Sequence, residues 1–259
     1  MEEKKKKSIF KKWYFWVIVV VVVIVIVAVA GGSKNETTSS VDGGSDVKQT
    51  DTVKNDKQEA LYEVEDGKAY VWKDSIGSNY LIVTVPVKNT GSENLYLSTG
   101  TIDVEDDSGK LIKTVDMVSG YPQVLLPGET AYYYEETLLD EAVDTEALKT
   151  VPHLDVKKSK VDSVRYDLTE ITVKDGTYGG VKVSGRVENT TDKAESDVYV
   201  VAHLFDADGN LLEKQIAVLD NEIQPNEKIG FETSSTASYY KAKDVASYEV
   251  YAFPYQYQF

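Results

Sequence analysis

The chain has 259 residues, a formal net charge of −15, no cysteine and two histidines, and 42% of its residues are hydrophobic. The absence of cysteine excludes disulfides, a thiolate nucleophile and a Cys-ligated metal centre, and two histidines are too few for a multi-histidine metal centre. The excess negative charge repels phosphate backbones, so nucleic acid is not an expected partner. These counts lead us to expect no cofactor.

An uncharged apolar run follows a basic start. Residues 1–12 contain six lysines, and residues 13–30 read WYFWVIVVVVVIVIVAVA. As a helix this run would be roughly 27 Å long, close to the apolar thickness of a bilayer, and a lone segment in lipid satisfies its backbone only as a helix. Basic residues are concentrated before the run, which predicts a cytoplasmic N-terminus. We therefore expect a single-pass cell membrane protein, held by residues 13–30, with extracellular C-terminal domains.

A cleavable signal peptide is the second interpretation of this start. Ala28-Val29-Ala30, followed by Gly31, has the small-x-small form of a cleavage site. The apolar run is longer than the about 7–15 residues of a signal-peptide core, which favours a retained anchor. Cleavage after Ala30 stays open here, and either alternative exports the rest of the chain.

Residues 31–59 contain almost no large apolar side chains. Such a segment cannot bury enough apolar surface to offset the entropy of ordering it. We expect a disordered linker with a typical reach of roughly 30 Å, which would hold the folded part away from the lipid.

Beyond the linker the sequence repeats itself, mostly at an offset of 100 residues. Two segments match at 100, one at 98 and one at 84: Val87–Thr90 with Val187–Thr190, Asp106–Lys110 with Asp206–Asn210, Leu126–Glu129 with Gln224–Glu227, and Val161–Ser163 with Val245–Ser247. The smaller last offset predicts about fourteen extra residues in the first repeat, within residues 138–155. Residues 138–148 are compatible there with a short amphipathic helix.

Both repeats have the composition of β-structure. Residues 80–85, 198–205 and 248–253 are rich in β-branched and aromatic side chains, which favour strands. Four turn pairs suit the positive φ of tight hairpins: Asp66-Gly67, Ser108-Gly109, Asp175-Gly176 and Asp208-Gly209. We expect an all-β fold of two tandem antiparallel immunoglobulin-like sandwiches, over residues 60–168 and 169–259.

One run of motifs resembles the FxLYD domain family. A strand and an Asn-Thr turn precede a strand that ends in Leu204-Phe205-Asp206, and a turn at Gly209 and then Pro225-x-Glu227 follow, before Phe231. The first repeat has Val104-Glu105-Asp106 instead, and the second has Ala202 where the family has Phe. The resemblance covers residues 69–259 at most. It implies small extracytoplasmic β-sandwich modules of Gram-positive membrane proteins, and it brings no catalytic residues.

Catalytic and metal-binding patterns are sparse in this sequence. His153 and His203 are the only imidazoles, and no G-x-S-x-G motif provides a nucleophile elbow. Asp206, Asp208 and Asn210 are the candidate calcium ligands, because their oxygens follow one another at alternate positions in an exported acidic chain. The same residues also suit a hairpin turn for backbone reasons alone. We expect the turn rather than a metal site.

Eighteen tyrosines are the remaining feature, with clusters at 132–134, at 239–240 and at 251, 255 and 257. Exposed tyrosines suit a surface that binds protein or glycan, although alternate residues of a strand also pack in a sandwich core. The expected function is a non-enzymatic interaction or spacer module for a protein or cell-wall partner. The alternative is calcium-dependent or glycan-directed binding, or weak hydrolytic activity, in one repeat.

Overall fold

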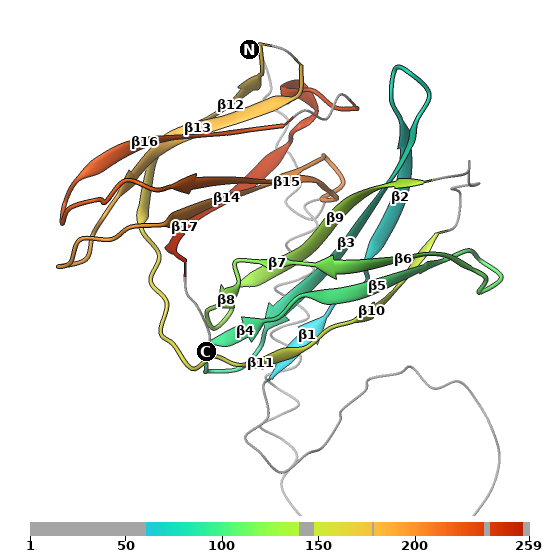
Figure 1. The fold of residues 1–259 in the computed structure, drawn as a ribbon, viewed down its shortest axis with the longest axis horizontal. Helices are drawn as coiled ribbons and strands as arrows, with labels where there is room; N and C mark the ends of the chain where they lie inside the picture. Colours follow the sequence, from blue (N-terminus) through green and yellow to red (C-terminus); the bar gives the residue numbers. More distant parts are fainter. Residues whose placement is uncertain (1–60, 140–147, 178, 236–238, 256–259) are drawn as a thin grey trace, which may run out of the picture. The chain divides into compact units, whose positions relative to one another are not determined.

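The computed structural model describes residues 61–139, 148–177, 179–235 and 239–255 (Figure 1). The predicted membrane helix and the predicted linker lie outside these ranges, as do residues 140–147 of the segment in which a short helix is predicted. Among the described residues, no helix is both long enough and apolar enough to cross a membrane. The strands pair antiparallel throughout, so the described chain has the predicted all-β, sandwich-like fold.

Residues 61–158, here called the first β region, contain three sheets around one core. The five-stranded sheet has β1 (Tyr62–Val64), β2 (Lys68–Lys73), β3 (Asn79–Asn89), β7 (Gly120–Tyr121) and β9 (Thr130–Leu139). The second sheet has β4 (Leu95–Leu97), β8 (Val124–Leu125) and β11 (Val156–Lys158), and the third has β5 (Gly100–Glu105), β6 (Leu111–Val118) and β10 (Lys149–His153). Buried side chains from all three sheets form the core, including Leu81, Leu97, Ile102 and Tyr133.

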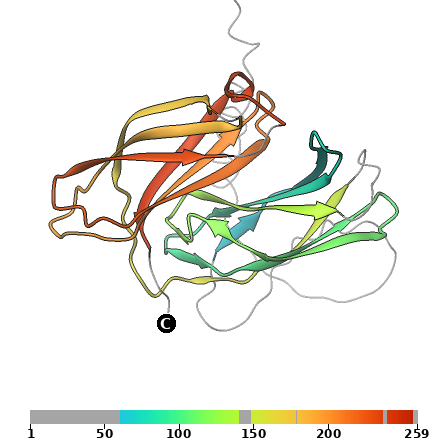
Figure 2. The same cartoon turned by 45° about the horizontal axis from the view of Figure 1, so that its top comes forward.

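Residues 166–255, here called the second β region, contain two three-stranded sheets that Figure 2 shows as two layers. One has β12 (Asp167–Asp175), β13 (Val181–Glu188) and β16 (Lys228–Ser234), and the other has β14 (Val198–Phe205), β15 (Leu211–Leu219) and β17 (Ser247–Pro254). A short 3₁₀ turn, η2 (Ala242–Asp244), precedes β17. This region has a separate core, in which Val183 and Phe231 of one sheet meet Val200 and Leu204 of the other.

The three predicted strands are confirmed. Residues 80–85 lie in β3, residues 198–205 are β14, and residues 248–253 lie in β17. β3 shows the alternation that drives this arrangement, because Leu81, Val83 and Val85 point into the first core. The intervening residues Ile82 and Thr84 are also buried, since the second β region covers that face.

The predicted repeat has a structural counterpart in two buried asparagines. The Asn89 side-chain amide donates to the carbonyls of Glu93 and Leu125, at 2.8 and 3.0 Å. The Asn189 amide makes the same pair of bonds, to Lys193 at 2.7 Å and to Ile223 at 2.8 Å. Each asparagine therefore ties the end of a strand to the turn after it and to a segment more than thirty residues away.

The repeat match at offset 84 is wrong. β10 pairs with β5 as β17 pairs with β14, with Glu105 opposite Lys149 and Phe205 opposite Ser247. The strand equivalent to β17 is therefore β10, and residues 161–163 lie outside any strand. The strand pairing leaves no room for fourteen extra residues between the Pro-Gly turn and this strand. Of residues 138–148, predicted to be helical, residues 138–139 are the end of strand β9 and residue 148 immediately precedes β10.

The predicted turns are confirmed at Gly109 and Gly209, which have φ of 82° and 79° in the β5–β6 and β14–β15 hairpins. Asp175-Gly176 does lie in a hairpin, but the positive φ angles belong to Gly179 and Gly180. The prediction of a hairpin at Asp66-Gly67 is wrong, because β1 and β2 do not pair with each other but both pair with β3. A Cβ atom on Gly67 would lie 2.3 Å from Thr150 Oγ1, so close packing explains this glycine.

Candidate functional site

The two β regions belong to one compact unit and share a small buried cluster. Ile82 and Tyr134 of the first region pack in it against Phe205 and Leu211 of the second. The equivalent residue of Leu211 in the repeat is Leu111, which is 53% exposed, whereas Leu211 is 4% exposed. Burial of Leu211 thus depends on the contact between the regions.

Arg165, in the segment that connects the regions, holds them together by ionic and apolar contacts. Its guanidinium donates to both carboxylate oxygens of Glu129, at 2.9 and 2.5 Å, and to the Val124 carbonyl at 2.7 Å. The same group lies 5.3 Å from the ring centre of Phe253 in β17. A bidentate ion pair fixes the orientation of the guanidinium group. Through its contact with Phe253, Arg165 therefore restrains the second region against the first.

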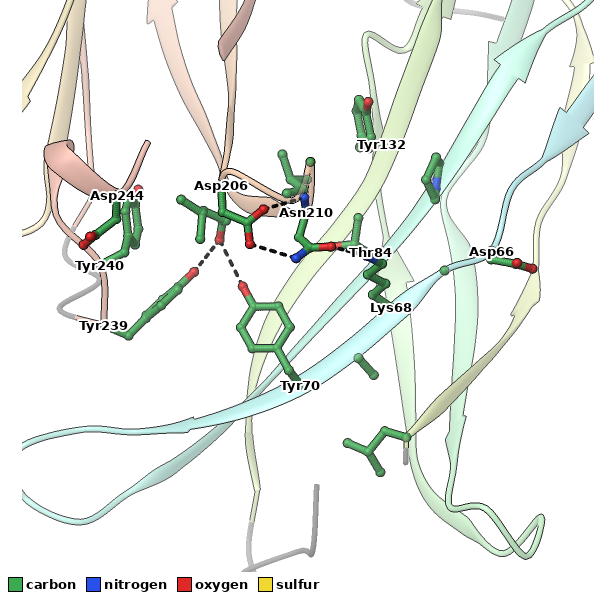
Figure 3. Close-up of a pocket in the computed structure, with 17 residues that line it drawn as sticks. Asp66, Lys68, Tyr70, Thr84, Tyr132, Asp206, Asn210, Tyr239, Tyr240 and Asp244 are labelled. Atoms are coloured by element: carbon green, nitrogen blue, oxygen red, sulfur yellow. Dashed lines mark hydrogen bonds between the residues drawn. The ribbon is translucent and has the colours of Figure 1, made fainter. Parts of the chain in front are cut away.

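A cavity of about 570 Å³, here called the junction cavity, lies between the two regions (Figure 3). Its size is that of a small-molecule site. The first region contributes side chains of β2, β3 and β9, and the second contributes the β14–β15 turn and the segment around η2. The labelled lining residues in Figure 3 are Asp66, Lys68, Tyr70, Thr84, Tyr132, Asp206, Asn210, Tyr239, Tyr240 and Asp244.

Tyrosine rings form one fixed wall of the junction cavity. The hydroxyls of Tyr70 and Tyr239 both donate to the Leu212 carbonyl, at 3.3 Å for Tyr70, and their rings meet edge to face with centres 6.3 Å apart. Tyr239 also lies 5.0 Å from the ring of Trp72, which stacks on Tyr80 at 4.8 Å. Burial raises the pKa of Tyr70 to about 12, so this phenol is a neutral donor at physiological pH.

Two hydroxyls of the wall have no hydrogen-bond partner among the described residues. Thr84 is 5% exposed, and its Oγ1 atom is buried without a partner. The Tyr132 hydroxyl has no hydrogen bond within the described ranges either, although its ring packs against Phe205, 5.4 Å away. Buried polar groups are normally paired, so the unpaired Thr84 Oγ1 is unusual, whereas Tyr132 is only half-buried.

The calcium candidates form the β14–β15 turn at one side of the junction cavity. Asp206 Oδ1 accepts hydrogen bonds from the backbone N–H groups of Asp208 and Asn210, and its Oδ2 accepts from the Asn210 amide at 2.8 Å. Burial raises the pKa of Asp206, but these hydrogen bonds more than offset it and hold the pKa below its ordinary value. Asn210 Oδ1 accepts from Lys68, and Asp208 is exposed.

These contacts occupy Asp206 and Asn210 within the protein. The described part of the chain brings no three His, Asp, Glu or Cys side chains together as a metal site would require. The equivalent Asp106 makes the same turn, accepting from the N–H groups of Ser108 and Lys110 at 2.9 and 3.0 Å. The turn interpretation therefore accounts for the carboxylate in both repeats.

Neither histidine lines the junction cavity. His153 is exposed in β10 and bonds Asp103 at 3.1 Å. His203 is fully buried in β14 beside the rings of Tyr132 and Tyr251, and neither ring nitrogen has a partner among the described residues. Burial, and then the charge of Lys214, lowers the pKa of His203 to about 3, so the ring is neutral at physiological pH.

Lys214 is an interface residue that the sequence pattern does not indicate. Its ammonium reaches from β15 to the first region, where it donates to the Tyr134 carbonyl at 3.0 Å and lies 5.0 Å from the Tyr121 ring centre. Burial lowers the pKa of Lys214 to about 8. A charged residue on a strand normally indicates the solvent face, and only the packing of the two regions reveals its position.

The tyrosine clusters divide between core and cavity. Tyr133 is in the first core, with its hydroxyl on the Ser98 carbonyl at 2.7 Å, whereas its neighbour Tyr132 lines the junction cavity. Tyr239 and Tyr240 also line the cavity, and Tyr255 stacks on Tyr199 at 4.8 Å. Residue 257 lies outside the described ranges. The packing interpretation is confirmed for Tyr133, and binding by the tyrosines that line the cavity stays a prediction.

The fold is that of a β-sandwich-like protein with a cavity at the contact of two β regions. Comparison of the chain with protein-family models gives no match, and comparison with curated proteins gives none.

Proposed function

We propose that this chain is a membrane-anchored, extracytoplasmic, non-enzymatic binding module. In this proposal residues 13–30 remain as the anchor, residues 31–59 are the linker, and the two β regions are tandem immunoglobulin-like sandwiches that bind a cell-envelope partner. The resemblance to FxLYD modules supports the same location and role, in a Gram-positive cell.

The observation that carries the binding role is the junction cavity. Its walls come from both regions, so the site requires the tandem arrangement. Tyr70 and Tyr239 are held by a shared acceptor, Leu212 O, before any ligand arrives. Rings fixed in advance bind with little further loss of entropy, which is a property of a binding site. The two histidines do not line it.

Location can be tested by labelling, because the chain has no native cysteine. We would place single cysteines at Ser8 and at Ile76, which lies at the exposed tip of the β2–β3 hairpin. In intact cells that produce the full chain, a membrane-impermeant maleimide should label Ile76→Cys and not Ser8→Cys. Lysis should then expose Ser8→Cys. Labelling of Ser8→Cys in intact cells would contradict the proposed orientation.

Binding can be tested by sedimentation of the full chain, in detergent micelles, with purified Gram-positive cell wall. We expect Tyr132→Ala to reduce the sedimented fraction, because this residue lines the junction cavity. Tyr248→Ala is the matched control, since Tyr248 is an exposed ring outside the cavity lining. Equal sedimentation of both variants and the parent, with unchanged melting temperatures, would exclude the cavity as the binding site for this wall material.

A further inference from the structure

Carboxylates outnumber ammonium groups in the junction cavity lining. Asp66, Asp206 and Asp244 line it, and Lys68 is the only basic residue among the described lining residues. Lys68 donates to Asn210 and lies in the field of Asp206, whose pKa it helps to lower. Asp66 and Asp244 have no basic partner within the described ranges.

Asp244 Oδ2 accepts a hydrogen bond from the Lys241 backbone N–H at 2.9 Å, but no ion pair neutralises its charge among the described residues. The Asp66 and Asp244 carboxylates lie on opposite sides of the view in Figure 3, with Tyr239 and Tyr70 between them. An ammonium group is attracted both by a carboxylate and by the face of an aromatic ring, and attraction to the ring increases as water is excluded. The apolar lining residues Pro86, Leu148 and Leu212 provide a surface for a hydrocarbon stem.

The wall also offers the two hydroxyls already described. Thr84 Oγ1 is buried and without a partner, which is costly unless a ligand or water completes its bonding. In the second region the equivalent hydroxyl, Ser184, bonds Thr172 at 2.9 Å. In the first region Lys68 lies opposite Thr84, at the position that Thr172 has opposite Ser184. Lys68 donates to Asn210 and not to Thr84. This is an observation independent of the carboxylates.

We infer that the junction cavity binds an organic cation, with primary ammonium groups carried on an apolar stem. Asp66 and Asp244 attract the ammonium groups, the tyrosine wall contacts the stem, and the hydroxyls of Thr84 and Tyr132 complete the polar contacts. This inference names the ligand chemistry of the proposed binding module and rests on that proposed function. A free diamine and a lysine side chain share this chemistry.

The test compares probes that differ only in charge, on the full chain in detergent micelles. 1,6-hexanediamine carries two ammonium groups, and 1,6-hexanediol has the same stem with neutral ends. The diamine should bind in calorimetry and raise the melting temperature, since a ligand of the folded state must stabilise it. The diol should do neither. Lysine blocked at both backbone ends is the third probe, and its binding relative to the diamine distinguishes a peptide source from a free diamine.

Charge-removing variants locate the site. Asp66→Asn and Asp244→Asn should each weaken diamine binding about two- to fivefold, as expected for an exposed charge pair. Asp107→Asn is the matched control, because it removes the same charge from an exposed turn outside the cavity lining. Thr84→Val removes the unpaired hydroxyl without a large change of volume, so it should fold normally and still weaken binding.

Three outcomes would overturn the inference: equal binding of the diamine and the diol, equal effects of Asp107→Asn and Asp66→Asn, or binding of N-acetylglucosamine with no binding of the diamine. The last result would identify a neutral saccharide site. If none of these probes binds while cell wall still sediments the protein through Tyr132, the cation inference fails and the proposed binding function stands. If the parent protein does not sediment with cell wall, the proposed function itself is contradicted.

Discussion

Thr84 and Ser184 occupy equivalent positions on β3 and β13, but only Ser184 has a hydrogen-bond partner among the described residues. One cross-strand neighbour of each residue also differs, being aromatic in the first region and charged in the second. Tyr134 pairs across from Thr84, whereas Glu232 pairs across from Ser184 and forms an ion pair with Lys182 at 2.6 Å. The first region thus presents an apolar face to the second, and the second presents a charged face to solvent.

Packing at this contact should appear in a pair of equivalent leucines. Leu211→Ala should lower the free energy of unfolding by about 2–4 kcal/mol, because it leaves a cavity between the regions. Leu111→Ala should change it by less than about 0.5 kcal/mol, since this side chain is largely exposed. Chemical denaturation of both variants measures the difference. Equal effects would contradict the burial of Leu211 against the first region.

The buried asparagines should be sensitive in both repeats. Asn89→Ala and Asn189→Ala each remove two hydrogen bonds to main-chain carbonyls. Leaving buried acceptors unpaired costs about 1–3 kcal/mol, and we expect losses of unfolding free energy in this range. Asn221→Ala, at an exposed position, is the control. A loss at Asn89 with none at Asn189 would show that the two motifs are not energetically equivalent.

His203 should make stability depend on pH on the acid side. Its folded pKa of about 3 lies below its ordinary value near 6.5, so the unfolded chain takes up the proton first. Stability from burying the neutral ring is fully present above about pH 6.5 and is lost as pH falls toward 3, by up to about 1.4 kcal/mol per unit. The cross-strand neighbours of His203 are Lys214 in β15 and Glu249 in β17.

Replacement of the buried ring tests this dependence. Denaturation between pH 5 and 7 should show a smaller slope of unfolding free energy with pH for His203→Leu than for the parent. His153→Gln, at the exposed histidine, should retain the parent slope. An unchanged slope in His203→Leu would mean that this ring is not shielded from protonation in the folded protein.

The β14–β15 turn should respond to backbone changes and not to calcium. Gly209 has φ of 79°, and a Cβ atom there would meet nothing within 4 Å, so Gly209→Ala should cost on the order of 1 kcal/mol from backbone strain alone. Asp208→Asn should be nearly silent, since Asn suits the turn equally. Melting temperatures with and without calcium measure both effects. A calcium-dependent stabilisation that Asp208→Asn abolishes would favour the metal site.

Local patterns in the sequence were sufficient for the strands and for several turns. Runs rich in β-branched and aromatic residues predict β3, β14 and β17, because these side chains favour the extended backbone of a strand. The Ser-Gly pair at 108–109 and the Asp-Gly pair at 208–209 predict hairpins, because the backbone there needs positive φ. These are short-range requirements, and neighbouring residues are enough to express them.

Only the tertiary structure decided which outward faces meet. Ile82, Thr84 and Leu211 are buried by a partner region distant in sequence, and the equivalents Lys182, Ser184 and Leu111 are not covered in this way. The local sequence predicts a hairpin at Gly67, but the close approach of Thr150 explains this glycine. The strand pattern likewise predicts an exposed Lys214, but its ammonium donates to the Tyr134 carbonyl of the first region. The junction cavity arises from the same long-range contact. Hydrophobic burial is proportional to the area removed from water and has no direction of its own, so a local pattern does not specify which surface will cover it.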